Sequence, residues 1–272
     1  MKQLPKIIWM YWGQGWDRAP LLVKKCKESW LHYNPEWTVH ALDANSLRDH
    51  FDLYRWMPCN DNWQPSYFQD LKEQLHQLLH STRLIKHKKI KIQALSDIIR
   101  INLLHQYGGV WVDATAWCHR PLDEWLTPLS KGFFCFCDKE DPSVISSWFL
   151  AAHKNNYVVD TFHAEVEKYW SKHDKATEYF WFHSIFKELY ENNEEFQSLW
   201  SPDKQIDNSI GRAYGPCYFA PYHKEKMMIF DAAYKQMIDS DQTPVFKLSN
   251  QKKMPLENYD SIKYLFDTIA KG

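Results

Sequence analysis

The sequence has no excess of charge of either sign and no internal repetition. Its 272 residues include 33 lysines and arginines against 34 aspartates and glutamates, which gives a formal net charge of −1. A chain with this balance produces no overall field that would attract nucleic acid. We therefore expect no nucleic acid partner. Repeats and low-complexity tracts are also absent, which excludes a repeat array.

Long apolar runs are missing as well. The apolar runs, such as residues 133–137 and 180–182, are far shorter than the roughly 20 residues of a membrane-spanning helix. The first five residues, Met-Lys-Gln-Leu-Pro, lack the apolar region of a signal peptide. These two absences predict a cytoplasmic protein.

The six cysteines show neither CxxC pairs nor the His/Cys spacing of a zinc site. This scatter is typical of reduced, mostly buried thiols. Aromatic residues, in contrast, are abundant at 16% of the chain. Their flat rings can stack on the C–H faces of sugars, although most such rings serve to fill a core.

Short strands alternate with longer helices along the chain. The aromatic and β-branched run at residues 6–12 predicts a buried strand that opens into a Gly-Gln-Gly loop. Further predicted elements are strands at 38–42, 110–113 and 132–137, helices at 20–33, 89–107, 155–170, 175–192, 223–239 and 258–270, and a helical insertion at 44–80. This alternation indicates an α/β sheet covered by helices, in which ligands bind beyond the carboxyl ends of the strands.

Three polar residues stand out against this pattern. Asp97 and Arg100 are neighbours on one helix face, opposite the apolar stripe Ile92, Leu95, Ile99 and Leu103. By itself such a pair is usually exposed and worth only about 0.2–0.5 kcal/mol. However, Asp113 follows Asp97 by sixteen residues and stands at the end of a predicted buried strand. A Gly-Gly turn directly before this strand brings the helix and the strand close together. A carboxylate at that position is not needed for packing.

The segments that carry these residues resemble a known signature. Residues 94–100 (Ala-Leu-Ser-Asp-Ile-Ile-Arg) and 107–115 (Tyr-Gly-Gly-Val-Trp-Val-Asp-Ala-Thr) are similar to GT-A glycosyltransferases with a DXD-type motif. More narrowly, they and residues 5–15 resemble the capsular polysaccharide synthesis and Och1-like sugar-transferase group. The resemblance implies a GT-A-type, Rossmann-like sheet flanked by helices. It also implies one domain over 1–272, with a donor-binding core at about 1–150 and acceptor-side, closing helices at about 151–272.

The resemblance assigns roles to individual residues. Asp97 and Arg100 would hold hydroxyls of the donor sugar, and Asp113 would contact the donor ribose or sugar and a divalent cation, so these three are the candidate catalytic residues. The remaining candidate donor-binding residues are Trp9, Tyr11, Trp12, Gly13, Gln14, Ala114, Thr115 and Lys247. The implied cofactor is Mn²⁺ or Mg²⁺, which would neutralise the leaving diphosphate; its candidate ligands are Asp113, Thr115 and His223.

Thr115 departs from the DXD pattern, because it offers a neutral hydroxyl where a second carboxylate is expected. Three explanations remain open: weaker metal binding, a ligand from elsewhere in the chain, or lysine and arginine cations that share the diphosphate charge. His223 and Lys247 are candidates because related folds often close over the diphosphate with a late His or Lys. A surface histidine or a solvated lysine is the commoner explanation for each.

Two other segments are candidate contacts for the remaining partners. His183 and Trp181, in the aromatic run 178–186, could line an acceptor pocket, although a core histidine is the commoner case. The basic run 83–91 is usually a solvated face. It also suggests the hypothesis of peripheral contact with the inner face of the cell membrane or with a lipid-linked acceptor.

Together these features predict an enzyme that moves a hexose from a nucleoside diphosphate sugar, most simply a UDP-hexose, to a growing capsular or other cell-surface glycan. The family resemblance also implies retention of the anomeric configuration. Two alternatives stay open. A non-catalytic glycan-binding protein would not need the three polar residues near one another, and a sugar-nucleotide hydrolase or phosphotransferase could use Asp113 as a nucleophile or metal ligand.

Overall fold

The computed structural model describes residues 4–51, 90–126, 132–137, 141–200, 232–240, 243–248 and 260–271. Most of the predicted insertion at 44–80, most of the basic run and His223 lie outside these residues. Within the described part, no helix is both long enough and apolar enough to cross a membrane.

The elements alternate in type, as the sequence predicts. The strands are β1 (Ile7–Tyr11), β2 (Thr38–Leu42), β3 (Gly109–Val112), β4 (Ala116–Cys118), β5 (Phe133–Cys137), β6 (Ile145–Ala152) and β7 (Val245–Lys247). The helices are η1 (Trp16–Arg18), α1 (Leu21–Tyr33), η2 (Ser46–Asp49), α3 (Ile92–Tyr107), α4 (Leu122–Trp125), α5 (Tyr157–Lys172), α6 (Trp181–Asn192), α7 (Glu194–Leu199), α8 (Ala232–Asp239), α9 (Asp260–Phe266) and α10 (Thr268–Lys271).

The main sheet has five strands in the order β2-β1-β3-β6-β5. Strand β1 runs parallel to β2 and β3, whereas β6 is antiparallel to both β3 and β5. The predicted α/β sheet is therefore confirmed. Strand β6 was not predicted, because its sequence Ile-Ser-Ser-Trp-Phe-Leu-Ala-Ala lacks a regular alternation of polar and apolar residues.

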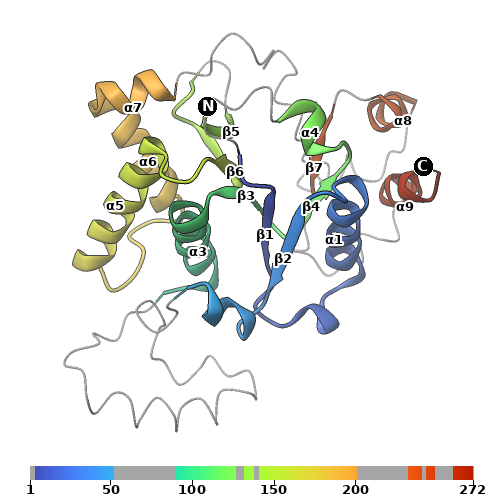
Figure 1. Cartoon of the computed structure of the whole chain (residues 1–272), viewed down its shortest axis with the longest axis horizontal. Coiled ribbons are helices and arrows are strands. Elements are labelled where there is room, and N and C mark those ends of the chain that lie inside the picture. The colour runs from blue at the N-terminus through green and yellow to red at the C-terminus, as the bar shows by residue number, and fades with distance from the viewer. Residues whose placement is uncertain are drawn as a thin grey trace, which may run out of the picture.

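Helices cover both faces of this sheet (Figure 1). Helices α3, α5 and α6 lie on one side, where they pack with Trp9 and Trp111 in the larger hydrophobic core. On the other side Trp30 of α1 packs with Ile8 and Val110 of the strands. Alternate residues of β1 and β3 thus serve opposite cores, which requires both strands to be apolar throughout.

A second, two-stranded sheet joins distant parts of the chain. Strand β4 pairs antiparallel with β7, so that Ala116 lies opposite Lys247, 131 positions later in the sequence. Trp117 and Phe246 of these strands pack with α1, α8 and α9 in a separate apolar cluster. The late part of the chain is thereby held next to the end of β3.

The Gly-Gly turn between α3 and β3 is tighter than the sequence alone indicates. Gly108 and Gly109 have φ angles of 71° and 92°, a region that residues with a side chain rarely adopt. A Cβ atom at Gly109 would lie 2.6 Å from the backbone oxygen of Ile7. Only glycine therefore allows β3 to start beside β1 directly after the helix.

Replacement of Gly109 by alanine should lower the free energy of unfolding by at least about 2 kcal/mol, because a positive φ and a backbone clash act together. Gly15→Ala is the matched control, since Gly15 has a φ of 87° but nothing within 4 Å of the added Cβ. We expect it to cost about 1 kcal/mol. Urea unfolding measures the free energy of unfolding of both variants, and an equal decrease in the two would contradict the predicted clash at Gly109.

Candidate functional site

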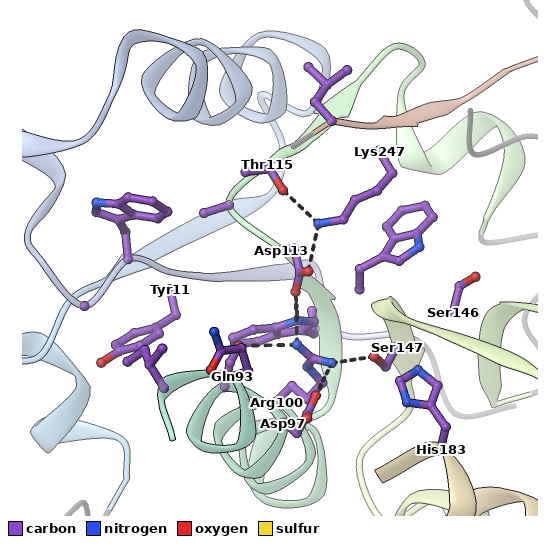
Figure 2. Close-up of a pocket in the computed structure, with 18 of the residues that line it drawn as sticks. Tyr11, Gln93, Asp97, Arg100, Asp113, Thr115, Ser146, Ser147, His183 and Lys247 are labelled. Carbon is purple, nitrogen blue, oxygen red and sulfur yellow. Dashed lines mark hydrogen bonds and ion pairs between the residues drawn. The ribbon is translucent and has the colours of Figure 1, made fainter. Parts of the chain in front are cut away.

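A cavity of about 660 Å³ opens where β1 and β3 end. Because these two strands are parallel, their carboxyl ends meet at the same edge of the sheet, the edge where α/β folds bind ligands. The walls come from the loop after β1, from α3, the segment after β3, β6, the residues before and within α6, and β7 (Figure 2). Its lining includes Asp97, Arg100 and Asp113.

Asp113 is fixed through its main chain and its side chain. Its backbone N–H donates to the carbonyl of Trp148 at 2.9 Å, and its carbonyl accepts from the N–H of Ala116 at 2.8 Å. One side-chain oxygen, Oδ1, accepts from Arg100 and from the indole of Trp111, both at 3.1 Å. These bonds hold the carboxylate at the cavity wall, where its side chain keeps 25% exposure.

Arg100 connects both carboxylates and is itself buried, at 5% exposure. Its guanidinium lies 2.5 Å from Asp97 Oδ1 and 3.1 Å from Asp113 Oδ1, and it donates to Ser147 Oγ at 2.6 Å. The rings of Trp111 and Phe182 flank it, with centroids 5.4 and 5.8 Å away. Asp97 and Arg100 are thus part of a buried network and not an exposed surface pair.

Lys247 reaches the same carboxylate from β7. Its ammonium donates to Asp113 Oδ2 at 2.8 Å and to Thr115 Oγ1 at 2.7 Å (Figure 2). The side chain is only 8% exposed. Pairing of β7 with β4 sets this position, because the N–H of Leu248 also donates to the carbonyl of Thr115 at 2.9 Å.

The pKa values of Asp97 and Asp113 are shifted in opposite directions. Burial alone would raise the pKa of Asp113, but the charges of Lys247 and Arg100 outweigh burial and lower it. Burial raises the pKa of Asp97 to about 6, since the nearby Arg100 offsets only part of the desolvation and the charge of Asp113 adds to the rise. Asp113 therefore stays ionised at neutral pH, whereas Asp97, with a pKa of about 6, titrates close to neutral pH.

The loop after β1 forms another wall, which includes Tyr11, Trp12, Gly13 and Gln14, four of the candidate donor-binding residues. Burial, with a smaller effect of Asp43, raises the pKa of Tyr11 to about 12, so its phenol stays neutral. Trp9 requires a correction. It is 1% exposed, donates its indole N–H to the carbonyl of Gly108 at 2.9 Å and does not line the cavity.

Residues of the α6 region form the wall opposite that loop. His183 lines the cavity, and its buried Nδ1 has no hydrogen-bond partner among the described residues. Burial, followed by the charge of Arg100, lowers the pKa of His183 to about 4, so the imidazole is neutral at pH 7. Tyr179 and Phe180 also line the cavity and are 71% and 59% exposed. Trp181 is a second correction, because it is 2% exposed and packs in the core.

The cavity also includes residues that the sequence analysis missed. Gln93 and Ser96 lie on the same face of α3 as Asp97 and Arg100, so the helical period could have identified them. Ser146, Ser147 and Trp148 could not be identified, because β6 itself was not predicted. Ile92, assigned to the apolar stripe, is 36% exposed and also lines the cavity.

The described side chains do not fit a divalent cation. Among the residues that the structure describes, no group of three or more His, Cys, Asp or Glu side chains could hold a metal ion. Both oxygens of Asp113 already accept hydrogen bonds from cationic groups, and Thr115 shares the ammonium of Lys247. His223, the third candidate ligand, lies outside the described residues.

The raised pKa of Asp97 predicts a pH-dependent stability. The unfolded chain loses the Asp97 proton near pH 4, whereas the folded protein keeps it until about pH 6. The contribution of Asp97 to the free energy of unfolding therefore falls as the pH rises from the unfolded to the folded pKa, by about 2 kcal/mol between pH 4.5 and 7. In urea unfolding, the free energy of unfolding of Asp97→Asn should fall by about 2 kcal/mol less than that of the wild type between pH 4.5 and 7. The exposed Asp123→Asn is the control, and identical pH dependence in all three proteins would contradict the assignment.

Comparison with solved structures gives distant matches. A structure titled PaToxG glycosyltransferase is 16% identical, with a TM-score of 0.46 and coverage of 99% of this chain and 88% of the other. The ligand-free glycosyltransferase domain of the YGT toxin is 10% identical, with a TM-score of 0.34 over 62% of this chain and 64% of the other.

Among curated proteins, the O-glycosyltransferase braB of Annulohypoxylon truncatum is 23% identical over 192 residues, which are 65% of this chain and 40% of the relative. The glycosyltransferase afumC of Aspergillus fumigatus is 24% identical over 175 residues, 60% of this chain and again 40% of the relative. The chain therefore spans about 40% of the length of the curated relatives it matches.

A family model covers far more of the sequence. The model described as capsular polysaccharide synthesis protein matches residues 1–60 and 75–265, which include every described residue of the cavity. On this match the chain belongs to the capsular polysaccharide synthesis protein family.

Proposed function

We propose that the chain is a glycosyltransferase that moves a hexose from a nucleoside diphosphate sugar, a UDP-hexose in the simplest case, to a growing capsular or other cell-surface glycan. The observation that carries the proposal is the network in which Arg100 joins Asp97 and Asp113 on one cavity wall. Membership of the capsular polysaccharide synthesis family supports it, as do relatives that are named glycosyltransferases.

The geometry suggests where each part of the substrates would lie. The nucleotide would lie against the loop Tyr11–Gln14, at the ends of the parallel strands. The donor sugar would lie over Asp97 and Arg100, which can accept from and donate to its hydroxyls. The diphosphate would approach Lys247, a cation at the cavity wall. The acceptor would then enter beside His183, on the side of the exposed aromatic rings.

In this reaction the bond between the anomeric carbon and the diphosphate oxygen breaks, and the acceptor hydroxyl oxygen bonds to the anomeric carbon. The hydroxyl proton passes to the leaving diphosphate, which serves as the base if the configuration is retained. A separate catalytic carboxylate is then not required. His183, neutral and part of the cavity wall, can orient the acceptor by a hydrogen bond.

The two alternatives fit the geometry less well. A glycan-binding protein would have no need for a buried network of Asp97, Arg100 and Asp113, since exposed aromatic rings and neutral hydrogen-bonding groups suffice for sugars. A phosphotransferase that uses Asp113 as nucleophile would need a carboxylate oxygen free to attack. Both oxygens instead accept hydrogen bonds from cations that lower the pKa of Asp113.

Calorimetric titration tests the assignment of the nucleotide sugar. We expect UDP-hexose or GDP-hexose to bind the wild type, and Asp113→Asn to weaken binding at least 10-fold because Arg100 and Lys247 lose the charge that fixes them. Asp123→Asn, an exposed carboxylate on α4 outside the cavity, is the control and should bind as the wild type does. Absence of nucleotide binding in the wild type, with and without Mn²⁺, would reject the transferase and favour a glycan-binding protein.

The acceptor side has its own test. Phe180→Ala should raise the KM for the glycan acceptor about 5- to 10-fold, equivalent to roughly 1 kcal/mol of lost ring contact. Donor affinity should be unchanged, because Phe180 is 59% exposed at the far side of the cavity. Leu199→Ala removes a comparably exposed apolar side chain outside the cavity and should change neither value. An effect of Phe180→Ala on donor binding alone would refute the acceptor assignment.

A further inference from the structure

The ammonium of Lys247 occupies the position that the DXD comparison would give to a cation. Asp113 and Thr115 stand at the two positions from which a metal-binding DXD motif would supply ligands. The Nζ of Lys247 lies 2.8 Å from Asp113 Oδ2 and 2.7 Å from Thr115 Oγ1, so it is bound by both (Figure 2). A lysine needs one carboxylate and tolerates a neutral hydroxyl as its second partner, whereas Mg²⁺ and Mn²⁺ favour carboxylate oxygens.

The fold holds this ammonium in place. Lys247 lies directly opposite Ala116 in the β4–β7 ladder, and the next residue, Leu248, bonds back to the carbonyl of Thr115. With 8% of its side chain exposed, Lys247 is not a solvated surface lysine. A buried ammonium is retained only where partners compensate for lost water, and Asp113 and Thr115 provide them.

The ammonium also has capacity for a substrate. It carries three N–H groups, and the described residues accept two of them. Lys247 lines the cavity, so the third group can donate to an anionic oxygen that enters. A phosphate oxygen suits this group, because a charge-assisted hydrogen bond to an anion is stronger than one to a neutral acceptor.

The charges around the cavity disfavour a divalent ion beside this lysine. Asp97 and Asp113 can supply two negative charges, and Arg100 and Lys247 supply two positive charges in direct contact with them. A metal ion bound to Asp113 and Thr115 would have to displace the ammonium or lie against it, and like charges at such short range repel strongly. No excess of negative charge remains among these four groups to attract a divalent cation.

We propose that Lys247 is the cation that neutralises the donor diphosphate in this protein, and that nucleotide binding and sugar transfer therefore need no Mn²⁺ or Mg²⁺. This inference rests on the proposed function. Asp113 then acts as the group that positions the ammonium, and Thr115 completes its support. As the glycosidic bond breaks, the charge that develops on the diphosphate meets an ammonium already oriented towards it.

Calorimetry of UDP and GDP binding in EDTA and in Mn²⁺ is the direct test. The wild type should bind its nucleotide with dissociation constants that agree within about 2-fold in the two buffers. Electron paramagnetic resonance of Mn²⁺ with the nucleotide-free protein should show no bound ion at micromolar concentrations. Nucleotide binding that disappears in EDTA and returns with Mn²⁺ would overturn this inference and leave the proposed function intact. Failure to bind any nucleotide in either buffer would reject both.

Two variants separate the charge of Lys247 from its packing. Lys247→Met should weaken nucleotide binding in EDTA at least 30-fold, and Mn²⁺ should partly restore it because Asp113 Oδ2 and Thr115 Oγ1 then lose their ammonium partner. Lys247→Arg keeps the charge and should lose less than the Met variant. Thermal unfolding checks that both variants are folded. The comparison of wild-type binding in EDTA and in Mn²⁺ tests the inference even if a variant fails to fold. Equal nucleotide affinity of Lys247→Met and the wild type in EDTA would also overturn the inference.

Discussion

The partly buried carboxylate of Asp113 is the constraint on which the site depends. An ionised carboxylate shielded from water is stable only beside opposite charges or hydrogen-bond donors. Asp113 receives them from Arg100 on α3, from Trp111 on β3 and from Lys247 on β7. Arg100 and Trp111 lie near Asp113 in the sequence, whereas Lys247 follows it by 134 residues, so one side chain ties distant parts of the chain together. Loss of either cation would remove one of the two charges that lower the pKa of Asp113 and fix its carboxylate at the cavity wall.

The same network explains why the late strand β7 belongs to the site. Residues 243–248 are held by their ladder with β4 and by their own buried side chains, since Val245, Phe246 and Leu248 are fully buried in the hydrophobic clusters. This ladder places an ammonium beside Asp113, which starts a turn closed by the bond from Ala116 N–H to its carbonyl. Sheet pairing, and not a long flexible side chain alone, gives Lys247 its position.

Local sequence patterns predicted the parts of the site that lie on one element. The period of α3 put Asp97 and Arg100 on one face, and the Gly-Gly turn put Asp113 at the end of a buried strand. Strand β6 was missed because its sequence lacks a regular alternation of polar and apolar residues. The contact of Lys247 was beyond such patterns, because strand pairing across more than a hundred residues is not encoded in local periodicity. The resemblance supplied Lys247 as a candidate, but not its partners.

The two tryptophan corrections have simple geometric causes. In β1, Trp9 and Tyr11 point to the same face, but only Tyr11 stands at the strand end, so Trp9 lies beneath α3 with its indole bonded to Gly108. Around α6, residues 180 and 183 share the cavity side, whereas Trp181 turns to the core.

In the proposed reaction this rigidity has a chemical consequence. The cation that would meet the diphosphate, Lys247, is held by a carboxylate and by strand pairing before the substrate arrives, so little reorganisation accompanies the build-up of negative charge. A neutral His183 on the other side adds no competing cation near the acceptor. Charge stabilisation and acceptor positioning are thus assigned to opposite walls of one cavity, and the charge of Arg100, which lowers the pKa of His183, links the two.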